Sequence, residues 1–484
     1  MRGLAVTQRK QKPTNSPSLQ GFLPKFVINF LKDHKAEYNK LKRTEQYGVA
    51  KYLLKVGLRH DHNTVEEAST IHWQDHKALF GRAGRFRQVN TALGGWFVDI
   101  TEPHYRTGEA VAWVLNDEAQ RLLNDLLELP EEFCETDVER GLVRPNGRSY
   151  KIPADGIESR TKAGSQCRYG RGLMRPVAEV DGEGLHRFHH VAQGWLSRKP
   201  CPEGYEWAYA LWKNIANRKG QAAADDRATR ARNQAAAMLY VAKASDIETL
   251  SIPTTYKESR AGRLYATGDV NLQQSLSEVR KVALAGCFDI DLANCHWSIL
   301  SQLADRLGVS VPSIKSYLDD KNKIRQEIAH DAGSDIKDAK ACLLAMIYGG
   351  SVHTRNGEIE KTLGTEAVEK LRSSETVKAF QADLRKLLPV IVSHYENKVK
   401  KSGYLINDAG RQFSVKEENR HKLAFILQGA ESVALEAMLN VLKDDVAVLC
   451  HDGLVAYHEP DRMTLETAIA DATGYELKLE IEPL

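Results

Sequence analysis

The stretch AVLCHDGLVAYHE, residues 447–459, places one aspartate between two short apolar segments. AVLC and LVAY are rich in β-branched and aromatic residues, and each is predicted to form a strand. The tripeptide between them predicts a tight turn in which Gly453 is free to adopt a positive φ. Such a hairpin would hold the carboxylate of Asp452 at its tip, beside His451. Taken alone, the stretch fits an ordinary surface turn, in which Asp-Gly is common.

A second aspartate ends another predicted strand. AGCFDIDLANCHWSILSQLADRLG, residues 285–308, alternates polar and apolar residues over CFDIDL and then repeats its apolar residues at helical spacing. Asp291 falls at the end of the strand, where open sheets commonly present ligand-binding groups. Asp291 and Asp452 together could hold two divalent cations about 4 Å apart, an arrangement that serves in-line phosphoryl displacement. Hard oxygen ligands suit Mg²⁺, with Mn²⁺ as a substitute.

A third segment, DIKDAKACLLAMIYGGS, residues 335–351, predicts a helix ended by two glycines. Lys340, Leu344 and Tyr348 are four residues apart and therefore share one face of this helix. A lysine, an apolar shelf and a tyrosine on one face could hold a triphosphate at one end and stack a base at the other. The alternative is an amphipathic core helix whose lysine reaches back to water.

Together these segments resemble motifs A, B and C of the family A (DNA polymerase I-like) polymerases and the related phage-type single-subunit RNA polymerases. Asp291 stands in motif A, Lys340 and Tyr348 in motif B, and His451 with Asp452 in motif C. AGRLYATGDVNLQQ is similar to the TGRLSS…PNLQN stretch of the DNA polymerases and to the GRVYA stretch of the RNA polymerases. GYLINDAGRQF and RHKLAFILQGAESVALEAMLNVL are similar to two further family segments, so that the resemblance covers about residues 255–484.

The resemblance implies an α+β right-hand polymerase with palm, fingers and thumb, acting as a template-directed nucleotidyltransferase on a template–primer. It implies that Asp291 and Asp452 bind two Mg²⁺ ions and are catalytic together with Lys340. It also implies contacts to the incoming dNTP or NTP from Lys340, Leu344, Tyr348 and His296. The implied nucleic-acid contacts are Arg263, Asn271, Gln274, Arg411, Arg420, Gln428 and His451.

Several positions depart from the family pattern. His296 stands where the DNA polymerases place a glutamate that blocks the ribose 2′-OH, and a histidine can either exclude that hydroxyl or hydrogen-bond it. Ile336 replaces an arginine, Leu344 an aromatic residue and Gly453 an acidic residue. We favour a DNA polymerase without a proofreading exonuclease. A primase-like or transcribing RNA polymerase is the alternative on the same fold, and a non-catalytic nucleic-acid-binding replication initiator is the alternative from another class.

The remaining chain divides by composition. Residues 1–20 predict a disordered basic tail, and residues 21–130 predict helices followed by a β-ribbon that carries His104, Tyr105 and Arg106. This order suggests a winged-helix-like module that binds DNA, or else a structural cap. Residues 131–255 predict a linker and a thumb-like helical region, and residues 256–484 the palm and fingers. The cluster HRFHH, with His186, His189 and His190, is a candidate metal site without accompanying cysteine or acidic spacing.

The composition of the chain limits its possible partners and cellular location. A formal net charge of +3 permits a nucleic-acid partner without requiring one. The sequence has no run of about 18 apolar residues, so we predict no membrane span. The seven cysteines form no CxxC pair, which argues against a compact zinc site and against a disulfide scaffold. A reducing, cytoplasmic setting is the simplest account.

Overall fold

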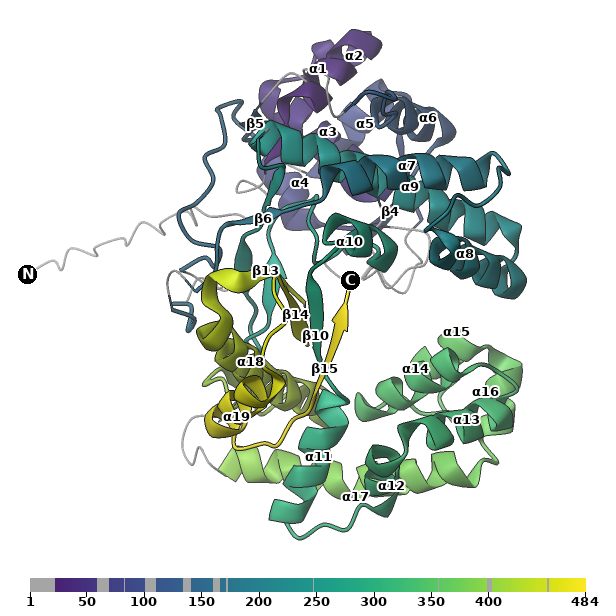
Figure 1. Cartoon of the computed structure of the whole chain (residues 1–484), viewed down its shortest axis with the longest axis vertical. Coiled ribbons are helices and arrows are strands. Elements are labelled where there is room, and N and C mark those ends of the chain that lie inside the picture. The colour runs from purple at the N-terminus through teal and green to yellow at the C-terminus, as the bar shows by residue number, and fades with distance from the viewer. Residues whose placement is uncertain are drawn as a thin grey trace, which may run out of the picture.

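The computed structural model describes residues 22–58, 69–81, 83–100, 110–133, 141–159, 166–170, 173–246, 248–355, 357–397, 403–450 and 452–484. The predicted basic tail therefore lies outside the described residues. Helices predominate, and the strands form small antiparallel sheets, as expected for an α+β protein. Figure 1 shows the N-terminal helices and helices α11–α17 at opposite ends of the molecule, with a four-stranded sheet between them.

The N-terminal region combines helices with a three-stranded antiparallel sheet of order β2-β4-β3. Its elements are α1 (Lys25–His34), α2 (Ala36–Asn39), α3 (Arg43–Leu58), β2 (Ser69–His72), α4 (Trp73–Phe80), α5 (Ala83–Ala92), β3 (Phe97–Asp99), β4 (Ala110–Leu115) and α6 (Asp117–Leu126). The order from α3 to β4 is helix, strand, helix, helix, strand and strand, with β2 beside β4 in the sheet, and the winged-helix-like module stays a prediction. The predicted tip residues His104, Tyr105 and Arg106 lie outside the described residues.

The middle region is a bundle around one long helix. It contains α7 (Gly182–Leu196), α8 (Glu206–Lys219) and α9 (Gln221–Ser245), together with the short pairs β1 (Leu23–Pro24) with β5 (Leu142–Val143) and β6 (Val177–Glu179) with β7 (Ser251–Pro253). Asp181 caps α7, because its Oδ1 accepts a hydrogen bond of 2.8 Å from the backbone N–H of Gly184. The fully buried alanines of α9, residues 235–236 among them, allow close packing of the neighbouring helices.

The central sheet joins segments that are far apart in the sequence, as its teal and yellow strands show (Figure 1). Its strand order is β13-β14-β10-β15, and all neighbours are antiparallel. The strands are β10 (Phe288–Leu292), β13 (Val446–Leu449), β14 (Gly453–Ala456) and β15 (Leu479–Pro483). The strands predicted from CFDIDL, AVLC and LVAY are therefore present. The two faces of the β13–β14 hairpin pack against different hydrophobic clusters, which anchors the turn between them.

The chain after residue 255 also forms helices and two strand pairs outside this sheet. They are α10 (Ser277–Ala283), α11 (Cys295–Arg306), α12 (Pro312–Asp319), α13 (Lys321–Ala332), α14 (Ile336–Ile347), α15 (Glu358–Leu363), α16 (Thr365–Leu371), α17 (Glu375–Asn397), α18 (Asn419–Leu442) and α19 (Arg462–Thr473), with the strand pairs β8 (Tyr256–Glu258) with β9 (Leu264–Ala266) and β11 (Tyr404–Ile406) with β12 (Gln412–Ser414). By length and composition alone, the segment Asn419–Asp445 could cross a membrane, but 67% of its apolar window is buried inside the protein. That burial is typical of a core helix.

Candidate active site

The two aspartates singled out by the sequence are brought together by one pair of strands. Asp291 lies opposite Gly453 in the register of β10 and β14, and Asp452 is the residue immediately before. The backbone N–H of Leu292 donates a hydrogen bond of 3.1 Å to the carbonyl of Asp452. Because side chains alternate along a strand, Asp289 lies on the same face of β10 as Asp291. The sheet thus assembles three carboxylates at one end of the β13–β14 hairpin.

The electrostatics of this group favour a cation. Burial raises the pKa of the Asp291 carboxyl to about 7, and the charges of Asp289 and Asp452 add to the rise. The positive charges of Arg280 and Lys340 oppose the rise without cancelling it. A proton or a metal ion would therefore stabilise the Asp291 carboxylate.

The environment of Asp289 also favours a bound cation. Burial raises the pKa of its carboxyl, and the charges of Asp452 and Glu482 raise it further against the opposing charge of Arg280. Its Oδ1 atom is buried and has no hydrogen-bond partner within the described part of the chain. An oxygen-only donor set with an unsatisfied buried oxygen is what a hard divalent cation such as Mg²⁺ requires. The residues present therefore fit the predicted cation.

Gly453 has a different role from the one predicted. It belongs to the extended strand β14 instead of providing a positive φ at the turn. A Cβ atom at residue 453 would lie 2.2 Å from the carbonyl oxygen of Ile290 and 2.5 Å from Oδ1 of Asp291. The prediction of a positive φ was wrong, because the requirement for glycine comes from the neighbouring strand and not from the turn. The absence of an acidic side chain at this position follows from the space that Asp291 occupies.

Of the three residues that the sequence placed on one face, Lys340 and Leu344 belong to α14, and Tyr348 directly follows it. The side chain of Asp335 accepts a hydrogen bond of 2.8 Å from the backbone N–H of Asp338, which fixes the start of the helix. Lys340 and Leu344 are exposed, and Lys340 is close enough to Asp291 to lower the pKa of its carboxyl. The helix ends before Gly349, as the sequence predicted, and Gly349 has a φ of +83°.

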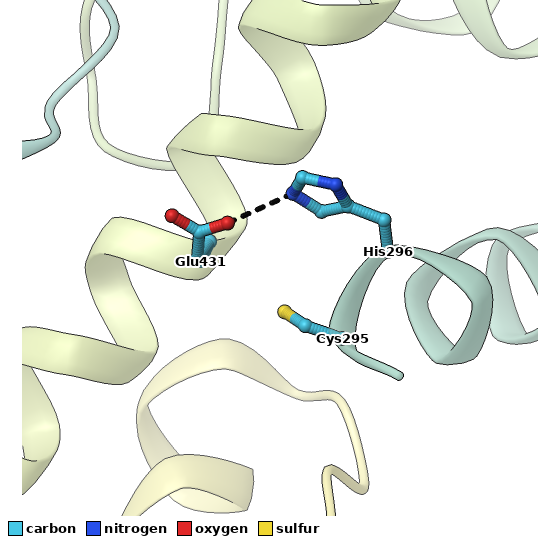
Figure 2. A group of neighbouring side chains, drawn as sticks. All are labelled: Cys295, His296 and Glu431. Atoms are coloured by element: carbon cyan, nitrogen blue, oxygen red, sulfur yellow. Dashed lines mark ion pairs between the residues drawn. The ribbon is translucent and has the colours of Figure 1, made fainter. Parts of the chain in front are cut away.

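A buried network of polar side chains lies beside this helix, and Figure 2 shows the contact between His296 and Glu431 within it. Nδ1 of His296 is 2.7 Å from the hydroxyl of Tyr348, and its Nε2 is 2.9 Å from Oε2 of Glu431. Glu431 is 1% exposed, and its two carboxylate oxygens accept hydrogen bonds of 2.6 and 2.7 Å from Nε and Nη2 of Arg263. The network thus links α11, the end of α14, α18 and the turn that precedes β9.

The protonation of the network follows from the buried carboxylate. Burial raises the pKa of Glu431, but the charge of Arg263 and the contact with His296 outweigh this effect, so that the net pKa is lowered. The ionised carboxylate can only accept a proton from its neighbour, so the proton of His296 is assigned to Nε2, which lies close to Oε2 of Glu431 without the alignment of a regular hydrogen bond. Nδ1 is then the acceptor of the Tyr348 hydroxyl proton. Burial raises the pKa of Tyr348, which keeps that hydroxyl protonated.

Sequence reasoning did not identify Glu431. The available signal was a single acidic residue within the apolar helix segment AFILQGAESVAL, because a buried charge requires a partner. Cys295, His296 and Glu431 also bring a sulfur, a nitrogen and an oxygen within 4.8 Å of one another. However, both oxygens of Glu431 are occupied by Arg263, and burial raises the pKa of the Cys295 thiol, with the charge of Glu431 adding to the rise. These contacts fit an internal network better than a metal centre.

The residues predicted to contact nucleic acid fall into different environments. Arg263 is held by Glu431, and Nε of Arg411 donates to Oε1 of the buried Glu258 at 2.7 Å. Asn271 is 2% exposed and accepts at Oδ1 a hydrogen bond of 2.9 Å from the backbone N–H of Gln274.

Two of the other three predicted contacts, Arg420 and Gln428, belong to α18. Arg420 is exposed near the start of α18, where its Nε lies 2.6 Å from Oε2 of Glu418. Gln428 is half-buried in the middle of the same helix. His451 lies outside the described residues. Arg420 therefore presents an accessible cation beside Gly349, whose Cβ position would be 3.1 Å from the Cβ of Arg420.

Comparison with known proteins finds similarity to solved structures. No protein-family model and no curated protein sequence matches the chain. Ninety solved chains match this chain in structure. One of them is the POL domain of Pol1 from M. smegmatis, which was solved in complex with DNA primer-template and dNTP. That similarity has a TM-score of 0.43 at 16% sequence identity and covers 64% of this chain and 67% of the other.

Proposed function

We propose that the protein is a template-directed nucleotidyltransferase of the family A type, and specifically a DNA polymerase. The observation that carries this proposal is that Asp291 on β10 pairs with Gly453, the residue directly after Asp452, and that the charge of Lys340 on α14 acts on the Asp291 carboxyl. The pKa of about 7 at Asp291 supports it, because a carboxylate held in this state gains stability from a bound cation. The order of the sequence motifs supports the same reaction.

The chain's own residues would act as follows. Asp291 and Asp452 would hold divalent cations, which when bound activate an attacking hydroxyl and stabilise a leaving phosphate. Lys340 is exposed and would contact the phosphates of the incoming nucleotide, where negative charge develops in the transition state. Tyr348 follows α14 directly and would lie against the sugar and base. Arg420 would contact the backbone of the nucleic acid.

The network around His296 supports a deoxyribose substrate. The hydroxyl proton of Tyr348 is committed to His296, and the charge of Arg263 acts on the same hydroxyl, where it opposes the burial that raises the pKa of Tyr348. A ribose 2′-OH packed against this pair would therefore find its potential partners already engaged. A buried polar group without a partner costs about 1–3 kcal/mol. We infer that the network disfavours ribonucleotides.

Primer extension on a defined template–primer with Mg²⁺, using dNTPs and NTPs in separate reactions, tests the proposal. The wild type should extend with dNTPs, and Asp291→Ala and Asp452→Ala should abolish extension while binding of the template–primer changes little. Asp319→Asn, which alters an exposed carboxylate at the end of α12, is the matched control and should keep activity. Extension with NTPs alone would indicate an RNA polymerase. Binding without any extension would indicate a non-catalytic initiator.

A further inference from the structure

Two histidines on α7 direct their Nε2 atoms toward the same point. His186 and His190 are one helical turn apart, and their Nε2 atoms are separated by 3.3 Å. Their rings are nearly perpendicular, at 85°. The third histidine of the HRFHH cluster, His189, is buried, and its Nδ1 faces the carbonyl of Arg232 instead. The cluster therefore divides into one core residue and one converging pair.

The hydrogen bonds available to this pair conflict. Nε2 of His186 also lies 2.9 Å from the carbonyl oxygen of Pro130, which can only accept a hydrogen bond. If Nε2 of His186 carries a proton for Pro130, it has no lone pair left for an N–H of His190. If it accepts from His190, the carbonyl of Pro130 loses its donor. An ion bound to both nitrogens would use the lone pairs of both rings, and the carbonyl of the exposed Pro130 would then take its hydrogen bond from water.

The spacing suits a tetrahedral ion. Zn²⁺ binds histidine nitrogens at about 2.0–2.1 Å, so nitrogens 3.3 Å apart correspond to an N–metal–N angle of about 105–110°. That angle is the tetrahedral value. Two histidines at positions i and i+4 of a helix are also the spacing by which a helix presents a histidine pair to zinc.

The surroundings offer a third ligand. The pair lines a cavity of about 700 Å³ that also contains Glu131 and Glu203. Glu131 directly follows Pro130 and is exposed, and its carboxylate would reach the histidines by a change of rotamer, because among the described residues only Cys295, His296 and Glu431 already have three ligand atoms within 4.8 Å of one another. Lys199 lines the same cavity and opposes a cation, and the two glutamates offset that charge.

We propose that His186, His190 and Glu131 bind one transition-metal ion of the Zn²⁺ type, separate from the candidate active site. The fourth position would hold water. Since Glu131 follows α6 and both histidines belong to α7, the ion would tie the end of the N-terminal region to the central helical bundle. The expected role is structural.

Co²⁺ binding to the full-length chain tests this site, because tetrahedral Co²⁺ has an intense visible spectrum. The metal-free protein is titrated with Co²⁺ in excess Mg²⁺, which occupies oxygen-only sites. One equivalent should bind with a tetrahedral spectrum and without a sulfur-to-cobalt charge-transfer band, and Zn²⁺ should displace it. His190→Ala alters an exposed side chain, so the fold should persist, and affinity should fall at least about tenfold, as should that of His186→Ala.

Two control variants separate this site from the rest of the molecule. His330→Ala removes an exposed histidine on α13, and Cys295→Ser removes the thiol of the buried Cys295–His296–Glu431 group. Both should bind Co²⁺ as the wild type does. Zn²⁺ should raise the Tm of the wild type and not that of His190→Ala. Absence of a tetrahedral spectrum, or equal binding by His190→Ala, would overturn the proposal.

Discussion

Asp291 and Gly453 face each other across β10 and β14, and the carboxylate of Asp291 occupies the space where a side chain at 453 would lie. A Cβ there would also meet the backbone oxygen of Ile290 at 2.2 Å, which cannot move without disturbing the sheet. This contact makes Gly453 part of the candidate active site. It also couples the hairpin that carries Asp452 to the strand that carries Asp291.

Gly453→Ala should therefore lower both stability and activity. Overpacking of this kind costs about 1–3 kcal/mol, and the displaced hairpin should misplace Asp452. Urea denaturation and primer extension measure the two effects. Gly84→Ala is the matched control, since among the described residues no atom outside its chain neighbours and the backbone of its own helix lies within 4 Å of its Cβ position on α5, and alanine is the better helix former. Unchanged stability and extension in Gly453→Ala would contradict the crowding inferred here.

The raised pKa of Asp291 predicts how stability depends on pH without a divalent cation. An aspartate titrates near pH 3.9 in the unfolded chain and at about 7 here, so the folded protein binds the extra proton between these values. Stability contributed by this group is full below pH 4 and is lost as the pH rises toward 7, by an amount on the order of a few kcal/mol. Below pH 7, protons should also compete with Mg²⁺ for the carboxylate.

Denaturation by urea in the presence of a chelator, at pH 5 and pH 8, tests this dependence. The wild type should lose more stability between these pH values than Asp291→Asn, in which the titrating group is absent. Added Mg²⁺ should restore stability to the wild type at pH 8 and have less effect on the variant. Parallel pH dependences in the two proteins would show that Asp291 titrates normally.

Much of this arrangement could be predicted from local sequence. The change from alternating to helical spacing located β10 and α11, and the Asp-Gly pair between apolar segments located the β13–β14 hairpin. These features depend on residues that are neighbours in the chain. The positive φ assigned to Gly453 was wrong because its crowding comes from Asp291, on a strand far upstream.

Long-range ion pairs explain what local sequence could not provide. Arg263 and Arg411 are basic residues in segments that resemble nucleic-acid contacts, yet their guanidinium groups meet the buried carboxylates of Glu431 and Glu258. The partners are 168 and 153 residues apart. No spacing rule relates such positions. Only the folded chain shows which charges are engaged inside the protein.

The N-terminal region provides a prediction about duplex binding. If this region is a winged-helix-like module that binds DNA, α5 should approach the duplex, and Arg87 is an exposed cation on that helix. Arg87→Glu in the full-length chain should weaken duplex binding and reduce its salt dependence by about one phosphate contact. Lys386→Glu makes the same change of charge on α17, at an exposed position, and should bind duplex DNA as the wild type does. Equal salt dependence in Arg87→Glu and the wild type would favour a structural cap.

The choice of sugar depends on the contact between His296 and Tyr348. His296→Ala should open space over the nucleotide sugar and release the Tyr348 hydroxyl, which can then donate to a ribose 2′-OH. Ribonucleotide incorporation relative to deoxyribonucleotide should rise at least tenfold, equivalent to about 1.4 kcal/mol of lost discrimination. The measurement is the ratio of kcat/KM for the two nucleotides in single-nucleotide addition.

Tyr348→Phe separates the two parts of this explanation. It removes the hydroxyl but keeps the ring, so it frees Nδ1 of His296 as an acceptor without enlarging the site, and it should increase ribonucleotide use less than His296→Ala does. His353→Ala, at an exposed histidine after α14, should leave the ratio unchanged. Because His296 is buried, an unaltered thermal transition must accompany its effect. If the wild type already prefers NTPs and His296→Ala lowers that preference, the network selects ribose, and the protein is an RNA polymerase.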